Sequence, residues 1–250
     1  MSQRRVFKLI DNDQIAIQLY NKDTDLEGCM KVLREGFIPT ESISLAVGLN
    51  LPEATQAHSD IGKLAQYNLS DGISLIARHL ASDQIVGFSI NKIHSRPVPG
   101  IPPFLQQFRE ENCHCSESNK IINFLEFADS KFDLFAKFNT ECFMECVMLS
   151  THPDFTGRKV GFNLVDCTIN LAREISEGKY PDTIDESLIG KKPKVVFAIW
   201  TSKYSTRIGQ KIGFKTLAAI PVGDLKQYGL PYPERIPSQH SEFTLSAIEI

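Results

Sequence analysis

Long apolar runs separated by polar, turn-forming segments are the dominant pattern in this chain, and they predict a β-sheet. The runs at 141–149 and 195–200 are nearly continuous in apolar residues, as in central strands that are covered on both faces. The runs at 73–80 and 84–93 are separated by only Ala81-Ser82-Asp83, which predicts a hairpin. The remaining expected strands are 6–10, one that begins at Phe214, and 242–250.

Between these runs, apolar residues recur at helical spacing. The series from Leu26 to Phe37 follows a capping box that begins at Thr24, and Gly36 lies where such a helix would end. We expect an amphipathic helix over 159–175 to join the two continuous strands in a right-handed β-α-β unit. Further helices are expected in four places: a short one capped by Thr40 or Ser42, 59–68, 104–138 and 204–212.

Two polar segments read as insertions between these elements. The first, at about 97–120, opens with four prolines in seven residues, a composition that only a loop tolerates. The second, at 176–193, is polar and follows directly on the expected helix. No internal repeat and no boundary in composition divides the chain. We therefore expect one domain over residues 1–250.

Composition places the chain among ordinary globular proteins. Of its 250 residues 42% are apolar and 23% charged, so a disordered or fibrous protein is not expected. The net charge of −3 provides no general attraction to nucleic acid or to an acidic membrane surface. No apolar run has the length of a transmembrane helix, and the N-terminus lacks the apolar core of a signal peptide. The sequence predicts a soluble, cytoplasmic protein.

The six cysteines indicate neither a disulfide framework nor a strong metal site. Four of them lie within apolar, periodic segments, where free cysteine behaves as a small hydrophobe. Cys113-His114-Cys115 lies in a polar loop and could form half of a metal site, but no second cluster with ligand spacing follows. We expect no bound metal and a reducing compartment.

The segment from 141 to 175 carries the most informative motif. A buried strand runs through the short loop TGRKVG (156–161) into a helix, and the first N–H groups of a helix bind anions. Arg158 and Lys159 add positive charge, while Gly157 and Gly161 allow the backbone to approach closely. The loop lacks the Gly-Lys-Ser/Thr of a Walker A motif and the spacing of a dinucleotide-binding motif. A coenzyme A pyrophosphate loop is the remaining candidate.

At this point the chain resembles the GNAT superfamily of acyl-CoA-dependent N-acyltransferases. Its loop follows that family's coenzyme A pattern, except that Thr156 replaces a Gln or Arg and Lys159 replaces the middle glycine. Residues 199–214, IWTSKYSTRIGQKIGF, resemble the family's strand-helix-strand segment that ends in Lys-x-Gly-Phe. The segments 35–49, 123–135 and 201–205 resemble the arylalkylamine N-acyltransferases, especially the invertebrate enzymes of the dopamine type.

The resemblance implies a fold and a reaction. The fold would be a mixed α/β domain with a mostly antiparallel sheet of about seven strands and helices on both faces. The reaction would move an acetyl or other short acyl group from acetyl-CoA to a small primary amine, such as an arylalkylamine, without metal. Such an enzyme needs coenzyme A and the amine as partners, and neither nucleic acid nor membrane.

The resemblance also assigns roles to residues. Glu41 takes the position of the general base, and Thr201 and Ser205 take those of two serines near the reacting atoms. From the residues alone, Glu41 could equally favour a helix dipole, and Thr201 and Ser205 could cap a helix. The implied coenzyme A contacts are Met148, Leu149, Ser150, Thr151, Thr156, Gly157, Arg158, Lys159, Val160, Gly161 and Ser205.

Three features leave alternatives open. Many members of the superfamily protonate the leaving thiolate with a tyrosine, and Gly209 stands at that position. Lys159 could reach a phosphate, or could be tolerated at an ordinary helical φ. The 35–68 segment contains both acidic and apolar residues, so a polyamine, agmatine, an amino acid or a protein amine could be the acceptor. A non-catalytic coenzyme A-binding protein is the alternative from another class.

Overall fold

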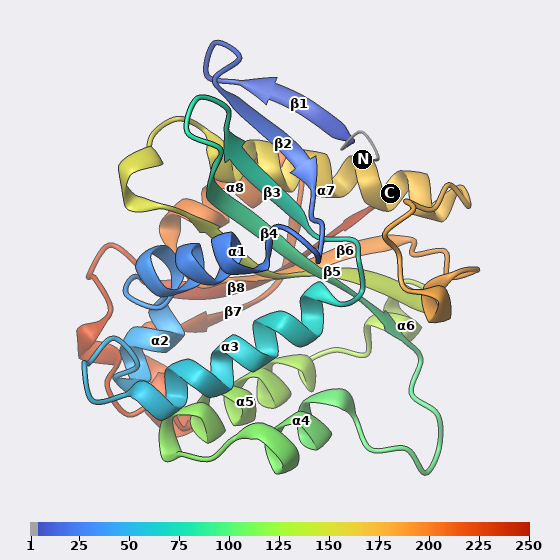
Figure 1. Ribbon diagram of the computed structural model, residues 1–250. Coiled ribbons are helices and arrows are strands. Elements are labelled where there is room, and N and C mark those ends of the chain that lie inside the picture. The colour runs from blue at the N-terminus through green and yellow to red at the C-terminus, as the bar shows by residue number, and fades with distance from the viewer. Residues whose placement is uncertain (1–4) are drawn as a thin grey trace.

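The computed structural model describes residues 5–250, in which eight strands form one sheet (Figure 1). The strand order is β1-β2-β3-β4-β5-β6-β8-β7, and only β5 and β6 pair in parallel within the described residues. The strands are β1 Val6–Ile10, β2 Ile15–Leu19, β3 Leu75–His79, β4 Gln84–Ser95, β5 Cys142–Thr151, β6 Val195–Trp200, β7 Lys215–Pro221 and β8 Glu242–Glu249. The predicted mixed, mostly antiparallel sheet is confirmed, with eight strands in place of about seven.

The additional strand is β2, which the sequence pattern does not predict. All of its five residues are buried between β1 and β3, including the polar Gln18. The turn before it consists of Asp11, Asn12 and Asp13, which have left-handed φ values of 55°, 53° and 61°. Asp and Asn tolerate this conformation better than most residues do. The hairpin therefore forms without the glycine that usually marks such a turn.

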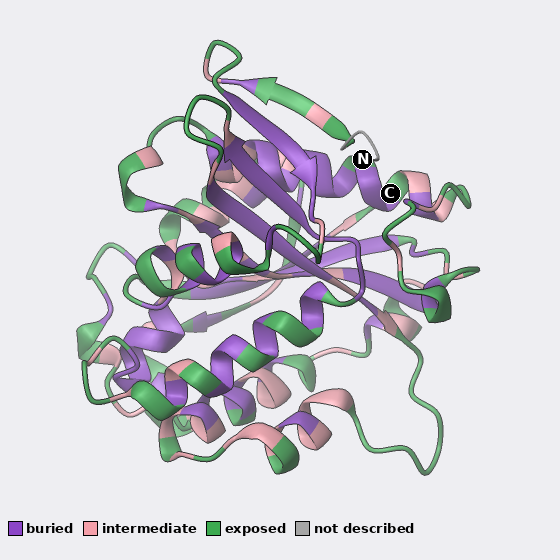
Figure 2. Cartoon of the chain, in the orientation of Figure 1, coloured by how far each residue is buried: buried purple, intermediate pink, exposed green. Residues whose placement is uncertain are grey.

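Helices cover both faces of the sheet, as expected, and α7 lies opposite α3 and α5 (Figure 1). One apolar core packs α1, α2, α3 and α5 against the sheet, and a second core packs α7 against its other face. Figure 2 shows the central strands buried and the outer faces of the helices exposed. The helices are α1 Leu26–Val32, α2 Ser42–Val47, α3 Thr55–Leu69, α4 Phe104–Asn112, α5 Ser116–Asp129, α6 Leu134–Lys137, α7 Val160–Ser176 and α8 Lys203–Ile212.

Several helix predictions need correction. The α1 helix continues as a turn of π-helix over Leu33–Phe37, and α3 begins at Thr55 rather than near residue 59. The predicted helix at 104–138 is three helices, because the chain turns at Cys113–Cys115 and again before Asp133, which caps α6. The cap of α2 is Glu41 rather than Thr40 or Ser42.

The two predicted insertions differ in structure. Residues 97–103 have no regular secondary structure, but the rest of the first insertion forms α4 and the start of α5. The second insertion is attached to the turn before β3. There the Thr183 hydroxyl donates to the carbonyl of Gly72 at 2.6 Å, and the N–H of Asp185 donates to the carbonyl of Asp71 at 3.1 Å. Within residues 5–250, no helix is long and apolar enough to cross a membrane.

The feature that positions the site is the divergence of β5 from β6. These strands pair at Met144 with Val196 and at Glu145 with Phe197, while the pairing of β5 with β4 continues to Thr151. A register shift in the β4–β5 ladder leaves Val147 as an extra residue at this point. Such a bulge bends a strand and increases its twist. The two central strands therefore separate towards their C-terminal ends.

Candidate active site

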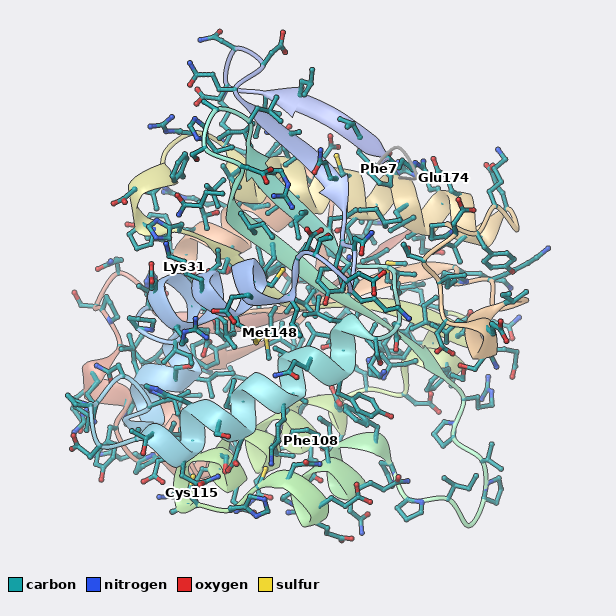
Figure 3. The ribbon with its side chains drawn as sticks, in the orientation of Figure 1. Phe7, Lys31, Phe108, Cys115, Met148 and Glu174 are labelled. Atoms are coloured by element: carbon teal, nitrogen blue, oxygen red, sulfur yellow. The ribbon has the colours of Figure 1, made fainter. Side chains whose placement is uncertain are left out.

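A cavity of about 220 Å³ lies where β5 and β6 separate. Its walls come from the second half of β5, the end of β6 with the start of α8, the segment around α2, and the helices α3, α4 and α5. Met148, on the wall formed by β5, lies near the centre of the molecule (Figure 3). The structure thus brings the predicted base, the two predicted hydroxyls and the predicted acyl-binding strand to one cavity.

Glu41 is the N-cap of α2 and one wall of the cavity. Its Oε1 accepts hydrogen bonds from the N–H of Ile43 at 2.9 Å and from the hydroxyl of Thr201 at 2.8 Å. Its Oε2 accepts from the N–H of Ser44 at 2.8 Å and from the Ser44 hydroxyl at 3.1 Å. A carboxylate has about four lone-pair positions. Glu41 therefore caps the helix and is held rigidly at the cavity wall.

The two predicted hydroxyls have different environments. Thr201 donates to Glu41, and its carbonyl accepts a hydrogen bond from the Ser42 hydroxyl at 2.6 Å. The cap of α8 is Ser202, and Ser205 completes the capping box with Ser202. The Ser202 and Ser205 hydroxyl oxygens are 2.9 Å apart, and both residues line the cavity. The possibility that Thr201 caps this helix is wrong, whereas Ser205 does have a capping role.

The phosphate-loop motif forms the N-terminus of α7, next to the end of β5. The N–H groups of residues 157–162 make no hydrogen bond to other residues of the described part of the chain. Gly157 has φ +78°, a conformation that favours glycine. Gly161 has no such φ, but a Cβ there would lie 3.3 Å from the Ile208 side chain. These free N–H groups at a helix start can bind an anion.

The two basic residues of this loop are both exposed but have different surroundings. Lys159 is the residue before the helix and has φ +61°, so it does not take an ordinary helical conformation. Its side chain is exposed, as is that of Arg158. Arg158 forms an ion pair with Asp11 at 3.0 Å and lies over the ring of Phe155. Asp11 therefore balances part of the positive charge beside the loop.

We expect Lys159→Gly to stabilise the protein. The substitution relieves the left-handed strain of a residue with a Cβ, which costs about 1 kcal/mol, although glycine gains freedom in the unfolded chain. The net change in the free energy of unfolding should be positive and below about 1 kcal/mol, measured by urea denaturation. A weaker affinity for coenzyme A in the same variant would show that the Lys159 ammonium contacts phosphate. Loss of stability would contradict the strain argument.

The segment Met148–Thr151 forms the other wall of the gap between the strands. In a strand, successive N–H groups point alternately to the two neighbouring strands. Beyond Glu145, no pairing with β6 is present in the described part of the chain, so alternate N–H groups of Met148–Thr151 face the gap. Ordered N–H groups in such a position can donate to an acyl carbonyl.

Gly209 is required by the packing of Trp200. A Cβ at Gly209 would lie 2.4 Å from the indole Nε1 of Trp200. Trp200 is buried and packs edge-on against Phe214, with ring centroids 5.3 Å apart. The position at which the resembled family carries its tyrosine is thus filled by an indole from β6. Tyr204 does not replace that acid, because its side chain is 62% exposed and its ring packs on His240.

The cavity is charged where it adjoins a second one of about 850 Å³, a feature that the sequence does not indicate. Lys92 and His94 on β4 and Glu145 on β5 line it, with Asp129 at the end of α5. The residue Asp129 as a whole is exposed, but the packing of protein around its carboxyl group, followed by the charge of Glu145, raises the pKa of that group to about 7. Burial opposes the protonation of His94, but the neighbouring Glu145 raises its pKa overall. Only the β4–β5 register, which pairs Lys92 with Glu145, could have indicated this cluster.

The Cys113–Cys115 loop is held by a buried carboxylate. Asp60 accepts hydrogen bonds from the N–H of His114 at 2.9 Å and from the hydroxyl of Ser118 at 2.7 Å. Burial opposes ionisation of Asp60, but these hydrogen bonds together lower its pKa. Among residues 5–250, no group of three or more His, Cys, Asp and Glu side chains could hold a metal ion.

Most of the chain is similar to solved N-acetyltransferase structures. Arylalkylamine N-acetyltransferase 2 from Aedes aegypti is 18% identical, with a TM-score of 0.74, and the match covers 94% of this chain and 99% of that one. A mosquito arylalkylamine N-acetyltransferase like 5b is 16% identical, with a TM-score of 0.73 and coverage of 94% and 100%.

A Drosophila melanogaster polyamine N-acetyltransferase that forms N-acetylagmatine is also similar. It is 17% identical, with a TM-score of 0.72, over 94% of this chain and 100% of that one. No protein-family model and no curated protein matches the chain. At these identities the likeness establishes the fold, which is the GNAT fold that the sequence resemblance implied.

Proposed function

We propose that this protein transfers an acetyl group from acetyl-CoA to a small primary amine, in a single domain. The observation that carries the proposal is the hydrogen bond between Glu41 and Thr201, which both line the cavity where β5 and β6 separate. It places a carboxylate and a hydroxyl, from segments 160 residues apart, beside the strand that would hold the acyl group. A packing contact alone would not require two polar groups at a cavity wall.

Coenzyme A would bind across the two ends of this gap. The free N–H groups of residues 157–162 would receive the pyrophosphate, with Arg158 and Lys159 next to it. The pantetheine arm would then extend between the separated strands. There the N–H groups of Met148–Thr151 would donate to it and to the thioester carbonyl, where negative charge develops during attack.

Glu41 would act as general base for the amine. An alkylamine has a pKa near ~10 and is protonated at neutral pH, so a proton must leave before it can attack. Since both oxygens of Glu41 already accept two hydrogen bonds each, a water can reach the carboxylate only if a hydroxyl turns away. The simplest route passes the proton through the Thr201 hydroxyl to Oε1. Thr201 would thus be a relay.

The leaving thiolate does not need the missing tyrosine in this scheme. A thiol has a pKa near ~8.5, so its anion is only a modestly poor leaving group at neutral pH. The Ser205 hydroxyl lines the cavity and can orient toward the sulfur, at the expense of its hydrogen bond to the Ser202 carbonyl. Direct attack in a ternary complex needs no acyl-enzyme, and Cys146 on β5 is buried, which raises the pKa of its thiol.

Two classes of acceptor fit different parts of the cavity. Part of its wall is apolar, with Phe37, Leu64 and Leu125 among the lining residues, and suits the ring of an arylalkylamine. The charged residues described above, where the cavity adjoins the second one, suit an acceptor with a second polar group. The arylalkylamine implied by the resemblance is the first candidate, and the charged end supports a polyamine or agmatine as the second.

The decisive assay measures thiol release from acetyl-CoA with tryptamine, dopamine, agmatine and spermidine. We expect turnover with at least one of them, and calorimetric binding of coenzyme A in the absence of amine. Binding without turnover on any amine would support a non-catalytic coenzyme A-binding protein instead. Absence of binding would contradict the proposed role of the loop at 156–161.

A further inference from the structure

The proposed base is attached to β6 rather than to β5, the strand proposed to bind the acyl group. The Thr201 hydroxyl donates to Glu41, and the Ser42 hydroxyl donates to the Thr201 carbonyl at 2.6 Å, both at the end of β6. In the described part of the chain, the pairing of β5 with β6 ends at Glu145. The sheet therefore does not set the distance between the base and the acyl-binding residues. Contacts outside the sheet must do so.

A turn of π-helix over Leu33–Phe37, which we call the π-turn, packs against the end of β5. A Cβ at Gly36 would lie 3.0 Å from the Ser150 Oγ and 3.1 Å from the carbonyl oxygen of Thr151, so the backbone of the π-turn lies directly on this strand. Ser150 and Thr151 both line the cavity. Single π-helical turns are rare and occur frequently at functional sites.

A histidine at the end of β5 holds the π-turn by a side-chain hydrogen bond. His152 follows the last residue of β5, and its side chain is only 10% exposed. Its Nδ1 accepts a hydrogen bond from the N–H of Asp154 at 3.3 Å. A ring nitrogen that accepts carries no hydrogen, so Nε2 carries it and donates to Glu35 at 3.0 Å. Both ring nitrogens of His152 are therefore engaged, and one of them holds Glu35.

The π-turn connects Glu35 to the proposed base through a series of short hydrogen bonds. The N–H groups of Thr40 and Glu41 donate to the carbonyl of Phe37 at 3.0 and 2.8 Å. The Thr40 hydroxyl donates to the carbonyl of Gly36 at 2.6 Å. The backbone between Glu35 and Glu41 is thus closed by its own hydrogen bonds. A shift of the π-turn along or away from β5 would move Glu41 with it.

We propose that Glu35 and His152 are positioning residues, whose hydrogen bond sets the distance between Glu41 and the acyl-binding strand. This inference rests on the proposed acetyl transfer. Neither residue is among the described residues that line the cavity, so both act through the π-turn and not by touching substrate. His152 also begins the segment that leads into the loop at 156–161. One side chain therefore relates the base to both the acyl-binding strand and the proposed coenzyme A loop.

The first test removes the carboxylate that His152 contacts. A misplacement of about 1 Å can cost about 100-fold in rate, so a shift of half that size should cost about 10-fold. We expect Glu35→Ala to lower kcat by about 10-fold. The Kd of coenzyme A and the midpoint of urea denaturation should change little, because the Glu35 side chain is 48% exposed and exposed ion pairs stabilise proteins little. Glu35→Gln keeps an acceptor for Nε2 and should restore most of kcat.

The chain offers a matched control for this substitution. Glu27, on α1, forms an ion pair with Arg34 of the same π-turn at 2.7 Å, and its side chain is 84% exposed. Glu27→Ala removes a carboxylate from the π-turn but leaves the contact with His152 in place. Its kcat should equal that of the native protein. An equal loss of kcat in Glu27→Ala and Glu35→Ala would overturn the inference.

A second variant shifts the π-turn from its backbone side. Gly36→Ala places a Cβ against Ser150 and Thr151, and relief of these contacts moves the π-turn by a few tenths of an ångström. We expect kcat to fall by roughly three- to 10-fold, with coenzyme A still bound. Gly62→Ala, the same change where no atom lies within 4 Å, should leave kcat unchanged. Unchanged kcat in both Gly36→Ala and Glu35→Ala would show that the π-turn does not position the base.

Hydrogen exchange separates failure of this inference from failure of the proposed function. Without ligand, backbone amides of residues 33–45 should exchange at least about threefold faster in Glu35→Ala than in the native protein, Glu35→Gln or Glu27→Ala. Faster exchange with full kcat would overturn the inference while the acetyl transfer stands. If the native protein acetylates no amine, the proposed function fails. Faster exchange confined to Glu35→Ala would then still support the contact that holds the π-turn, and equal exchange in all four proteins would contradict it.

Discussion

Replacement of Glu41 by glutamine is expected to lower kcat for amine acetylation by about 10²- to 10⁴-fold, the usual contribution of a general base. The glutamine oxygen can still accept one of the helix-capping hydrogen bonds that Ile43 and Ser44 donate. The amide cannot take up a proton at neutral pH. Steady-state kinetics with a reactive amine and calorimetry with coenzyme A measure the two effects. Coenzyme A should bind to the variant and the native protein within about twofold.

Two further substitutions separate catalysis from capping. Ser44→Ala removes one hydroxyl donor to Oε2 of Glu41 and should change kcat little. Thr201→Val removes the donor to Oε1 and should lower kcat, while Thr201→Ser keeps the hydroxyl and should restore most of the activity. Full turnover by Glu41→Gln at neutral pH would rule out Glu41 as the base. Equal activity of the valine and serine variants would rule out the relay through Thr201.

Replacement of Gly209 by alanine is expected to destabilise the protein, although alanine normally stabilises the interior of a helix. The added Cβ would lie 2.4 Å from Nε1 and 3.0 Å from Cε2 of the buried Trp200. Such overpacking costs about 1–3 kcal/mol, which exceeds the roughly 0.5–1 kcal/mol that alanine gains over glycine in a helix. We expect the midpoint of urea denaturation to fall. The midpoint should fall further for Gly209→Tyr, and this variant should gain no activity.

The chain offers a matched control for this prediction. Gly62 lies within α3, has no left-handed φ, and has no atom within 4 Å of a Cβ built on it. Gly62→Ala should therefore raise the free energy of unfolding by roughly 0.5–1 kcal/mol. Adding Trp200→Leu should make Gly209→Ala less costly, because the two side chains compete for one space. If both glycine variants were stabilised alike, the indole would not be what excludes a side chain at Gly209.

Local patterns predict most elements of this fold. The continuous apolar runs of β5 and β6 and the amphipathic stripe of α7 each report burial directly, so the β-α-β unit is evident before any contact is known. Predictions fail where neighbours decide the structure. The strand β2 is short and preceded by a turn without glycine, and α2 is capped by Glu41, whose capping role depends on its side-chain geometry.

Sequence motifs likewise indicate the residues of the candidate site but not how they meet. The loop at 156–161 and the segment containing Thr201 can be identified from the chain, and so can Glu41 through its resemblance to a known family. The hydrogen bond that joins Glu41 to Thr201 spans 160 residues and depends on the packing of α2 near the end of β6. The left-handed φ of Lys159 and the indole that requires Gly209 are also consequences of packing.

The sequence by itself determined the arrangement of the central strands and helices and the loop that leads from β5 into α7, because periodicity and local turn chemistry act over a few residues. The tertiary structure alone decided that β5 and β6 separate, that Glu41 accepts a hydrogen bond from Thr201, and that Asp129 and Glu145 line the same cavity. These features depend on strand register and on helices packed from distant parts of the chain. No local pattern encodes such distances.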